Sequence, residues 1–307
     1  MTAFQYFCLI DLVFFSPNLI SKIFLLHLVI LWLELLSANG GRFDINQLLF
    51  ADDTALVADS EEKLCTLVSE FGRVCERRKL RVNVGKSKVM RCSRYSNWDR
   101  THMIVNGEPL EEVDCFKYLG SQVAADGGCE RDVVDRLNEG YRTWGALKRV
   151  MSNRGLGIKA KKSQYEGVIV PTALYGAEAW GMRSAGRRKV NVLDMKCLRS
   201  LVGVLRMDRV RNKEVRRRVG IERELPSKAD QRVLRWISHV ERMDEYCLAR
   251  RVLMAEVSGG GVLGRPRLGW MDDVKVALGN RGMTVEAARQ CAKGKIGKNG
   301  EPWYICH

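Results

Sequence analysis

The sequence has 307 residues, of which 46% are hydrophobic and 28% are charged. This balance excludes a disordered chain, and the length allows two or three compact subdomains. A formal net charge of +15 favours a polyanionic partner, nucleic acid before an anionic membrane, over a surface that is merely basic.

The ten cysteines are scattered along the chain, and no two of them form a C-x-x-C pair. This pattern fits neither a disulfide framework nor a zinc ribbon. We therefore expect reduced thiols in an intracellular protein, located in the nucleus or the cytoplasm.

The first segment, residues 1–40, is more apolar than the rest. It contains two apolar runs, residues 4–15, which include Asp11, and residues 23–36. Both are shorter than the roughly 20 apolar residues that a bilayer span needs, and no basic region precedes the first run as in a signal peptide. We expect a buried helix or a segment foreign to the rest of the chain. A signal anchor at residues 23–36 is the alternative.

A hairpin with acidic residues in its turn is predicted for residues 45–57. Two short apolar segments flank Asp52 and Asp53. Adjacent carboxylates in a tight turn suit a hard divalent cation, because such ions prefer oxygen ligands. A solvated turn that simply favours aspartate is the alternative reading of this pair.

In the remainder of residues 41–125, one helix is predicted, followed by several short strands. Asp59 and Glu62 form a capping box in front of an apolar face with helical spacing. Strand-like patterns follow at residues 80–84 and 88–92, and a second hairpin is predicted within residues 102–123, around Asn106-Gly107.

The chain becomes helical in residues 126–225. Helical stripes are predicted at residues 133–147, 165–180 (bent or started by Pro171) and 190–204. In residues 226–307 a further helix is expected at 229–243, followed by a triple-glycine break and an irregular basic tail. The fold class expected from this order is α+β.

Several motifs, in order, resemble reverse transcriptases of non-LTR retrotransposons. Residues 48–58 (LLFADDTALVA) resemble polymerase motif C, and residues 83–87 (NVGKS) resemble motif D. Residues 116–120 (FKYLG) are similar to motif E, the hairpin that grips the primer. The resemblance continues through segments of the thumb and beyond, at residues 174–180, 235–243 and 264–267, and it covers about residues 35–292.

The resemblance implies a partial polymerase palm within residues 41–125, followed by a mostly helical thumb. Asp52 would be the principal Mg²⁺ ligand and Asp53 its partner. Lys86 would be the motif D lysine that acts on the pyrophosphate; without the family it reads as a surface lysine. The residues implied in holding the primer strand are Phe116, Tyr118 and Gly120, although the two aromatic side chains also suit core packing. RNA template and DNA primer are the implied partners, with no small-molecule cofactor; the oligomeric state stays open.

A dense basic stretch occupies residues 206–223, with eight lysines and arginines. Such a stretch should neutralise phosphates and make binding salt-dependent, whereas a solvated helix face is the bland alternative. The candidate contacts to nucleic acid are Arg209, Arg211, Lys213, Arg216, Arg217 and Arg218. Trp180, Trp236 and Trp270 are candidates both for stacking on bases and for burial in a core.

A third carboxylate, from polymerase motif A, has no evident counterpart in the sequence. Asp11 lies too close to residues 16–19, which resemble the end of motif B, to be that group. The fingers that bind template and nucleotide are also missing. We therefore expect a truncated RNA-directed DNA polymerase, a nucleotidyltransferase by family, that is inactive alone. A non-catalytic, basic remnant that binds nucleic acid is the alternative.

Overall fold

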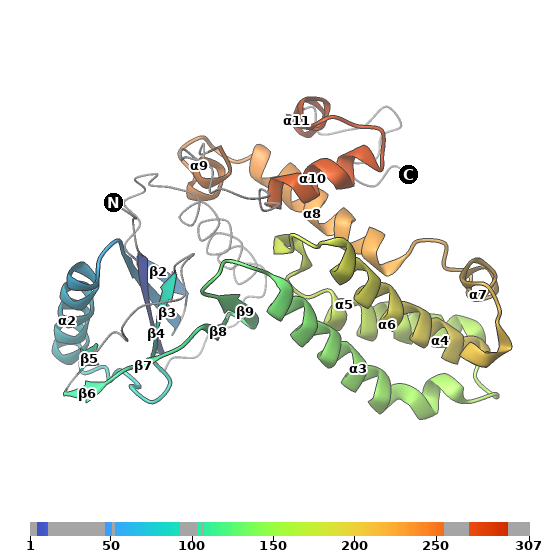
Figure 1. Ribbon diagram of the computed structural model, residues 1–307, viewed down its shortest axis with the longest axis horizontal. Helices are drawn as coiled ribbons and strands as arrows, with labels where there is room; N and C mark the ends of the chain where they lie inside the picture. The colour runs from blue at the N-terminus through green and yellow to red at the C-terminus, as the bar shows by residue number, and fades with distance from the viewer. Residues whose placement is uncertain are drawn as a thin grey trace. The chain divides into compact units, whose positions relative to one another are not determined.

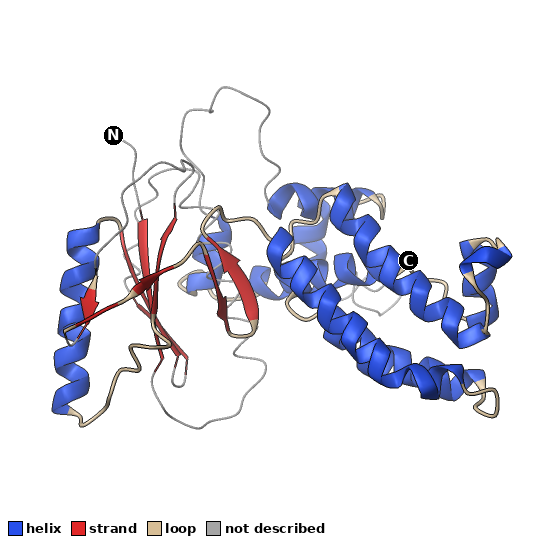
Figure 2. Ribbon diagram, turned by 60° about the horizontal axis from the view of Figure 1, so that its bottom comes forward, coloured by secondary structure: helices blue, strands red, loops and turns tan. Residues whose placement is uncertain are grey.

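The computed structural model describes residues 5–11, 47–50, 53–92, 103–105, 107–254 and 270–293. The chain divides into two compact units, which are described separately. Unit 1 comprises Met1–Gly128 and Asp244–Arg267, and unit 2 comprises Cys129–Met243 and Leu268–His307. The described strands all lie in unit 1, whereas unit 2 is helical (Figures 1 and 2). The expected α+β class is confirmed. The boundary expected between residues 225 and 226 falls inside unit 2.

A five-stranded sheet forms the centre of unit 1. Its strands are β1 (Gln5–Asp11), β2 (Gln47–Phe50), β3 (Asp53–Ala58), β4 (Lys88–Cys92) and β7 (Glu111–Glu112). They lie in the order β2-β3-β1-β4-β7, and all neighbours are antiparallel except β4 and β7. β1 corrects the helix expected in the first apolar run, because its backbone pairs with a strand on each side.

Helix α2 (Glu61–Arg77) packs against β3 and β1. Its buried Leu64 and Val68 meet Leu56 and Val89 of the sheet. Burial of one such side chain contributes about 1.5–3 kcal/mol, so this apolar face, more than helix propensity, holds α2 on the sheet.

The N-cap of α2 is Ser60 and not the expected Asp59. The Ser60 hydroxyl accepts the backbone N–H of Lys63 at 3.3 Å, with Ser60 in extended conformation. Asp59 instead accepts a hydrogen bond from the Lys63 ammonium at 2.7 Å. Sequence alone does not separate the two neighbouring cap residues, since both side chains can accept a backbone N–H.

Two small hairpins complete the described strands of unit 1. They are β5 (Ile104–Val105) with β6 (Glu108–Pro109), and β8 (Cys115–Tyr118) with β9 (Ser121–Ala124). A hairpin does follow residues 103–105, as predicted, but its second strand is β6; residues 115–120, the strand expected next, form a separate hairpin with β9. Residues 80–84 do not form the expected strand and contribute only one bridge, at Val82. The short helix α9 (Leu248–Met254) also belongs to unit 1.

Unit 2 is built of helices around one apolar core. Its longer helices are α3 (Glu130–Ser152), α6 (Ser184–Val202) and α8 (Leu225–Glu241). The shorter ones are α4 (Ile158–Gln164), α5 (Val170–Ala173), α7 (Asn212–Val219), α10 (Trp270–Gly279) and α11 (Val285–Lys293). Ile169, Leu193 and Leu198 are fully buried at its centre. The helices expected near residues 133–147, 190–204 and 229–243 are confirmed, while α7, α10 and α11 were not predicted.

The helix expected at residues 165–180 begins earlier and ends earlier. α4 continues through one π-helical turn, Tyr165–Ile169, into α5. Pro171 lies in the first turn of α5, where its missing N–H is tolerated. Beyond Ala173 the chain reaches Gly176 with φ +71°, a left-handed conformation that an α-helix cannot include.

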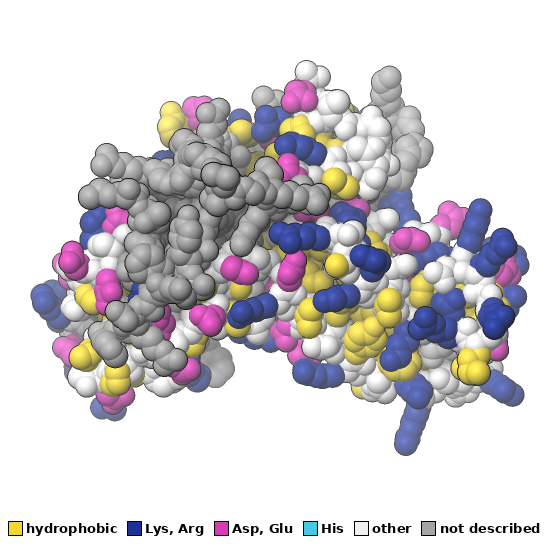
Figure 3. All heavy atoms as spheres, viewed as in Figure 1, with side chains coloured by type: hydrophobic (Ala, Val, Ile, Leu, Met, Phe, Trp, Pro, Cys, Tyr) yellow, Lys and Arg dark blue, Asp and Glu magenta, His cyan; other side chains and the backbone are white. Residues whose placement is uncertain are grey.

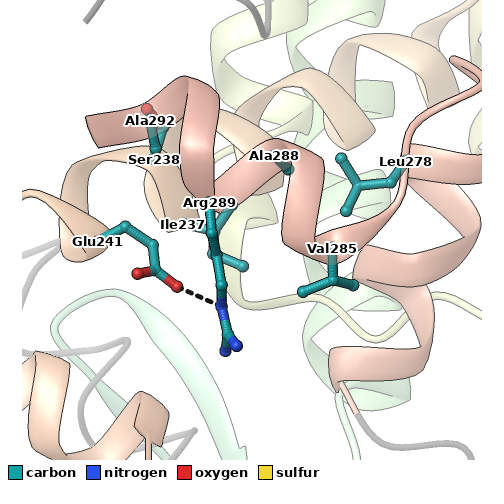
Figure 4. Close-up of a pocket in the computed structure, with 8 residues that line it drawn as sticks. All are labelled: Ile237, Ser238, Glu241, Leu278, Val285, Ala288, Arg289 and Ala292. Atoms are coloured by element: carbon teal, nitrogen blue, oxygen red, sulfur yellow. Dashed lines mark hydrogen bonds and ion pairs between the residues drawn. The ribbon is translucent and has the colours of Figure 1, made fainter. Parts of the chain in front are cut away.

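Helices α10 and α11 pack on α8. Figure 4 shows a small hollow there, with Ile237 of α8, Leu278 of α10 and Val285 of α11 among its lining residues. The Arg289 guanidinium donates to the buried Glu241 carboxylate at 2.8 Å at its rim. Among the helices of the described ranges, none combines the length and the apolar character needed to cross a membrane. Residues 23–36 lie outside those ranges.

Candidate functional site

The motif C hairpin consists of β2 and β3, which pair antiparallel with Phe50 opposite Asp53. Asp53 is the first residue of β3 and is half-buried. Asp52, the principal ligand expected from the resemblance, lies outside the described residues. Of the two candidate carboxylates, the described residues include Asp53, at the start of β3.

Asp11 is the residue that the sequence interpretation set aside. β1 pairs with β3 in antiparallel register, and Asp11 is the direct partner of Asp53. Backbone positions paired in this way have Cα atoms only about 4.5–5.5 Å apart. The available signal was an acidic residue, Asp11, inside a short apolar run. Spacing along the chain does not indicate this pairing, because it depends on the register of β1 on β3.

Lys86 lies near the same end of the sheet. β4 runs antiparallel to β1 with Leu9 opposite Lys88, so Lys86, two residues earlier, precedes β4 at the end where Asp11 closes β1. A tight turn positions it: the Lys86 N–H donates to the Asn83 side chain at 3.3 Å, and the Ser87 hydroxyl donates to the Asn83 carbonyl at 2.8 Å. The Lys86 side chain is exposed.

The motif E hairpin is formed by β8 and β9. Tyr118 pairs with Ser121 across a two-residue turn in which Leu119 (φ +47°) and Gly120 (φ +90°) both have positive φ. This is the pattern of a type I′ turn, whose twist matches that of the strands. Phe116 and Tyr118 are both buried, so they anchor the hairpin in unit 1.

Tyr118 couples this hairpin to the carboxylate end of the sheet. Its hydroxyl has no hydrogen-bond partner among the described residues. Burial raises the pKa of this phenol well above its ordinary value, and the nearby negative charge of Asp53 raises it further. The hairpin and Asp53 are thus within electrostatic reach of one another inside unit 1.

The basic stretch at residues 206–223 forms a short 3₁₀ turn, Arg206–Asp208, followed by α7. Arg209, Arg211 and Lys213 are exposed. Arg217 and Arg218 are exposed as well and share Glu214 as their ion-pair partner. Their hydrogen bonds, that of Arg217 foremost, lower the pKa of Glu214 to about 2.

Arg216 lies on the opposite face of α7. It is buried, and its guanidinium donates to the Asp194 carboxylate of α6 at 2.5 Å. The structure therefore separates Arg216 from the other five basic candidates. Its placement gives it a packing role within unit 2.

Positive charge is concentrated in one part of the chain. Residues 142–218 contain twenty lysines and arginines against five aspartates and glutamates, an excess equal to the +15 of the whole chain. Figure 3 shows lysine and arginine side chains gathered over the α3–α7 part of unit 2. Such a field attracts polyanions.

No metal cluster is complete within the described residues. Among them, no group of three or more His, Cys, Asp or Glu side chains is placed to hold a metal ion. The strand register makes Asp11 and Asp53 backbone partners, and Asp52 directly precedes Asp53 in the sequence.

Comparison with known proteins agrees with the motifs. Residues 18–123 match the family model of reverse transcriptase (RNA-dependent DNA polymerase). This match begins upstream of residue 35, where the motif resemblance starts. A putative uncharacterized transposon-derived protein of Caenorhabditis elegans is 26% identical over 211 residues, covering 66% of this chain and 74% of that protein. The family implies a divalent metal ion and the binding of RNA template and DNA primer. The resemblance expected from the motifs is confirmed: residues 18–123 are similar to reverse transcriptases, and the chain has a transposon-derived relative.

Proposed function

We propose that this chain carries the palm and thumb of an RNA-directed DNA polymerase from a non-LTR retrotransposon. In this proposal its metal site is formed by Asp11, Asp52 and Asp53. The observation that carries it is the register of β1 on β3, which makes Asp11 the partner of Asp53. Unit 1 takes the part of the palm and unit 2 that of the thumb.

The donor set fits a hard divalent cation, with Mg²⁺ as the proposed ion. Carboxylate oxygens are the ligands that Mg²⁺ prefers, and it usually takes one or two of them together with substrate phosphates. When bound, the metal would assist the primer 3′-hydroxyl and the pyrophosphate leaving group. Asp53, at the start of an inner strand, is held by backbone pairing with β2 and β1. This pairing would restrain the carboxylate before the ion binds.

The other residues expected from the resemblance have distinct roles in this proposal. Lys86, exposed on the turn before β4, would offer its ammonium to the leaving phosphates. Gly120 forms the turn of the motif E hairpin and would leave room for the primer strand. Phe116 and Tyr118, being buried, would act by holding that hairpin in position.

We further propose that the chain alone binds metal and nucleic acid but does not sustain DNA synthesis. Only 41 residues separate Asp11 from Asp53. This is a short stretch in which to place the elements of the fingers that bind nucleotide and template. A site with its metal ligands but without nucleotide alignment loses the positioning that phosphoryl transfer depends on.

The test is metal binding by the full chain, followed with Tb³⁺ luminescence and with Mn²⁺ electron paramagnetic resonance. Removing one carboxylate charge from the site should weaken binding by at least about tenfold. We expect this loss for Asp11→Asn and for Asp53→Asn. Asp59→Asn, at an exposed aspartate paired with Lys63, is the matched control and should bind as the wild type. Equal affinity in Asp11→Asn and wild type would refute the three-carboxylate site.

Primer extension on an RNA template with Mg²⁺ and all four dNTPs tests the second half of the proposal. We expect no extension by the chain alone. Extension that disappears in Asp52→Ala would show that the chain is a working polymerase and would overturn the proposed inactivity.

A non-catalytic nucleic-acid-binding protein is the second candidate function, favoured by the charge excess in residues 142–218. It predicts RNA or DNA affinity that falls steeply with salt and does not depend on Mg²⁺. Nucleic-acid binding together with undiminished metal affinity in Asp11→Asn and Asp53→Asn would select this function over the first.

A further inference from the structure

The three tryptophans proposed from sequence as base-stacking candidates are all buried. Trp180 and Trp270 also have their indole N–H groups occupied, by Asp132 at 2.7 Å and by the Glu178 carbonyl at 3.0 Å. These rings belong to the core of unit 2. These three tryptophans are therefore not available to stack on a base.

Trp144 of α3 differs from them. It is only partly buried, with one side packed on the core of unit 2. Its indole N–H is buried and has no hydrogen-bond partner among the described residues. Tyr141 lies three positions earlier in the same helix and is also partly exposed. Residues at this spacing share one helix face, so α3 presents two aromatic rings side by side.

Two lysines cover these rings. The Lys196 ammonium, from α6, lies 4.6 Å from the centroid of the Trp144 ring and 4.9 Å from that of Tyr141. The Lys148 ammonium, one helical turn beyond Trp144, lies 5.8 Å from the Trp144 centroid. Within the described ranges neither lysine forms an ion pair with a carboxylate. We name these four side chains the α3–α6 surface.

The α3–α6 surface combines the two features that recognise single-stranded nucleic acid. Exposed aromatic rings accept bases by stacking, and adjacent cations track the phosphates. A base stacked on such a ring is held more strongly than an exposed ammonium over it. A ligand could therefore displace Lys196 from the rings while giving it a phosphate partner. A duplex offers phosphates but keeps its base faces stacked internally.

We propose that the α3–α6 surface binds single-stranded nucleic acid, with one or two bases stacked on Trp144 and Tyr141 and phosphates bound by Lys148 and Lys196. This goes beyond the proposed polymerase function, because it concerns unit 2 and needs neither the metal site nor DNA synthesis. The charge excess around it, in residues 142–218, would bring the strand to the surface.

The test measures the affinity of the full chain for fluorescein-labelled oligo(dT) and oligo(U), and for a duplex hairpin, at a fixed salt concentration without Mg²⁺. Loss of a stacked base should weaken single-strand binding by about tenfold. We expect this for Trp144→Leu, with little change for the duplex, while Trp144→Tyr restores most of the affinity. Lys275→Gln, which removes one exposed charge from α10, is the control and should bind as the wild type.

Several results would overturn the proposal. One is unchanged oligo(dT) affinity in Trp144→Leu. Another is an equal loss of affinity for single strand and duplex in Trp144→Leu, which would mean that the surface recognises phosphate charge and not unpaired bases. A third is binding to phosphatidylserine vesicles that depends on Trp144 while oligonucleotide binding does not. If Trp144→Leu fails to fold, the double variant Lys148→Gln/Lys196→Gln takes its place in the test. The proposal expects its affinity for oligo(dT) to fall more than that of Lys275→Gln, and an equal or smaller fall would overturn it.

Discussion

Arg216 and Asp194 form a buried ion pair in unit 2, with 2.5 Å between the guanidinium nitrogen and the carboxylate oxygen. The same carboxylate accepts the Tyr165 hydroxyl at 2.6 Å and the Leu225 N–H at 3.0 Å. Four helical elements, from the π turn to α8, thus converge on one fully buried charge. Hydrogen bonds of this kind satisfy a group that is costly to bury alone.

Arg216→Ala should strongly destabilise unit 2, because it leaves the Asp194 carboxylate buried without its cation. Losses of about 3–5 kcal/mol are typical of breaking such a pair from one side. Arg217→Ala, at the next residue in α7, removes an exposed arginine and should change little. Denaturant unfolding followed by circular dichroism compares the two variants. Equal losses of unfolding free energy would contradict the assignment of Arg216 to packing.

Asp273 of α10 should make the stability of unit 2 depend on pH. Burial raises the pKa of its carboxyl to about 6, and the negative charges of Asp230 and Asp272 add to this against the opposing effect of Arg187. Because the folded pKa is raised, the stabilising contribution is complete below the ordinary carboxyl pKa and is lost as the pH rises through about 6. At pH 7, Asp273→Asn should therefore be more stable than the wild type by on the order of 1 kcal/mol.

The measurement is the free energy of unfolding of Asp273→Asn and of wild type between pH 4 and pH 7.5. The difference between them should grow with pH. Glu286→Gln, at an exposed residue of α11, should keep the wild-type pH profile. A gap that stays constant over this range would mean that Asp273 does not titrate within it.

Substitution by alanine should change stability in opposite directions at two glycines of α3, Gly140 and Gly145. A Cβ at Gly140 would lie 2.8 Å from the Leu193 side chain and 3.0 Å from Ala173, whereas a Cβ at Gly145 meets nothing within 4 Å. Overpacking of about 1–3 kcal/mol should outweigh the helix-propensity gain of about 1 kcal/mol in Gly140→Ala. Gly145→Ala meets no neighbouring atom, so it should show only the stabilising gain in helix propensity. Thermal unfolding should show a lower midpoint for the first variant and a higher one for the second.

Tyr118→Phe should stabilise unit 1, because it removes a buried hydroxyl that has no partner in the described parts of the chain. The gain expected from deleting such a group is about 1 kcal/mol. Tyr165→Phe, which breaks the hydrogen bond to Asp194, is the matched comparison and should be destabilised. Hydrogen exchange of β8 and β9 reports the first effect locally, and faster exchange in Tyr118→Phe would reveal a partner for the hydroxyl.

Local patterns predicted much of this fold. The apolar stripe of α2, the chain reversal after Val105 and the stripe of α3 depend on residues close in sequence, and all three are found. The exact cap of α2 was missed because Asp59 and Ser60 are equivalent in cap chemistry.

The candidate site was harder to predict, because its key relations are long-range. Asp11 meets Asp53 only through the register of β1 on β3, which no spacing within either motif contains. Arg216 and Arg217 are adjacent and alike, yet only the first faces Asp194, 22 residues away. Trp144 and Trp180 likewise differ only in which side of a helix or turn meets the core. Residue type indicated the chemistry, and packing decided which residues are available for it.

Unit 1 is discontinuous in sequence, since Asp244–Arg267 returns to it after most of unit 2 has passed. During synthesis, residues 1–128 emerge well before the segment that completes their unit. Because domains fold as units, unit 1 should reach its full stability only after α9 has left the ribosome. A fragment cut at Gly128 would likewise lack part of its own unit, so limited proteolysis between residues 129 and 243 should leave the two pieces of unit 1 associated.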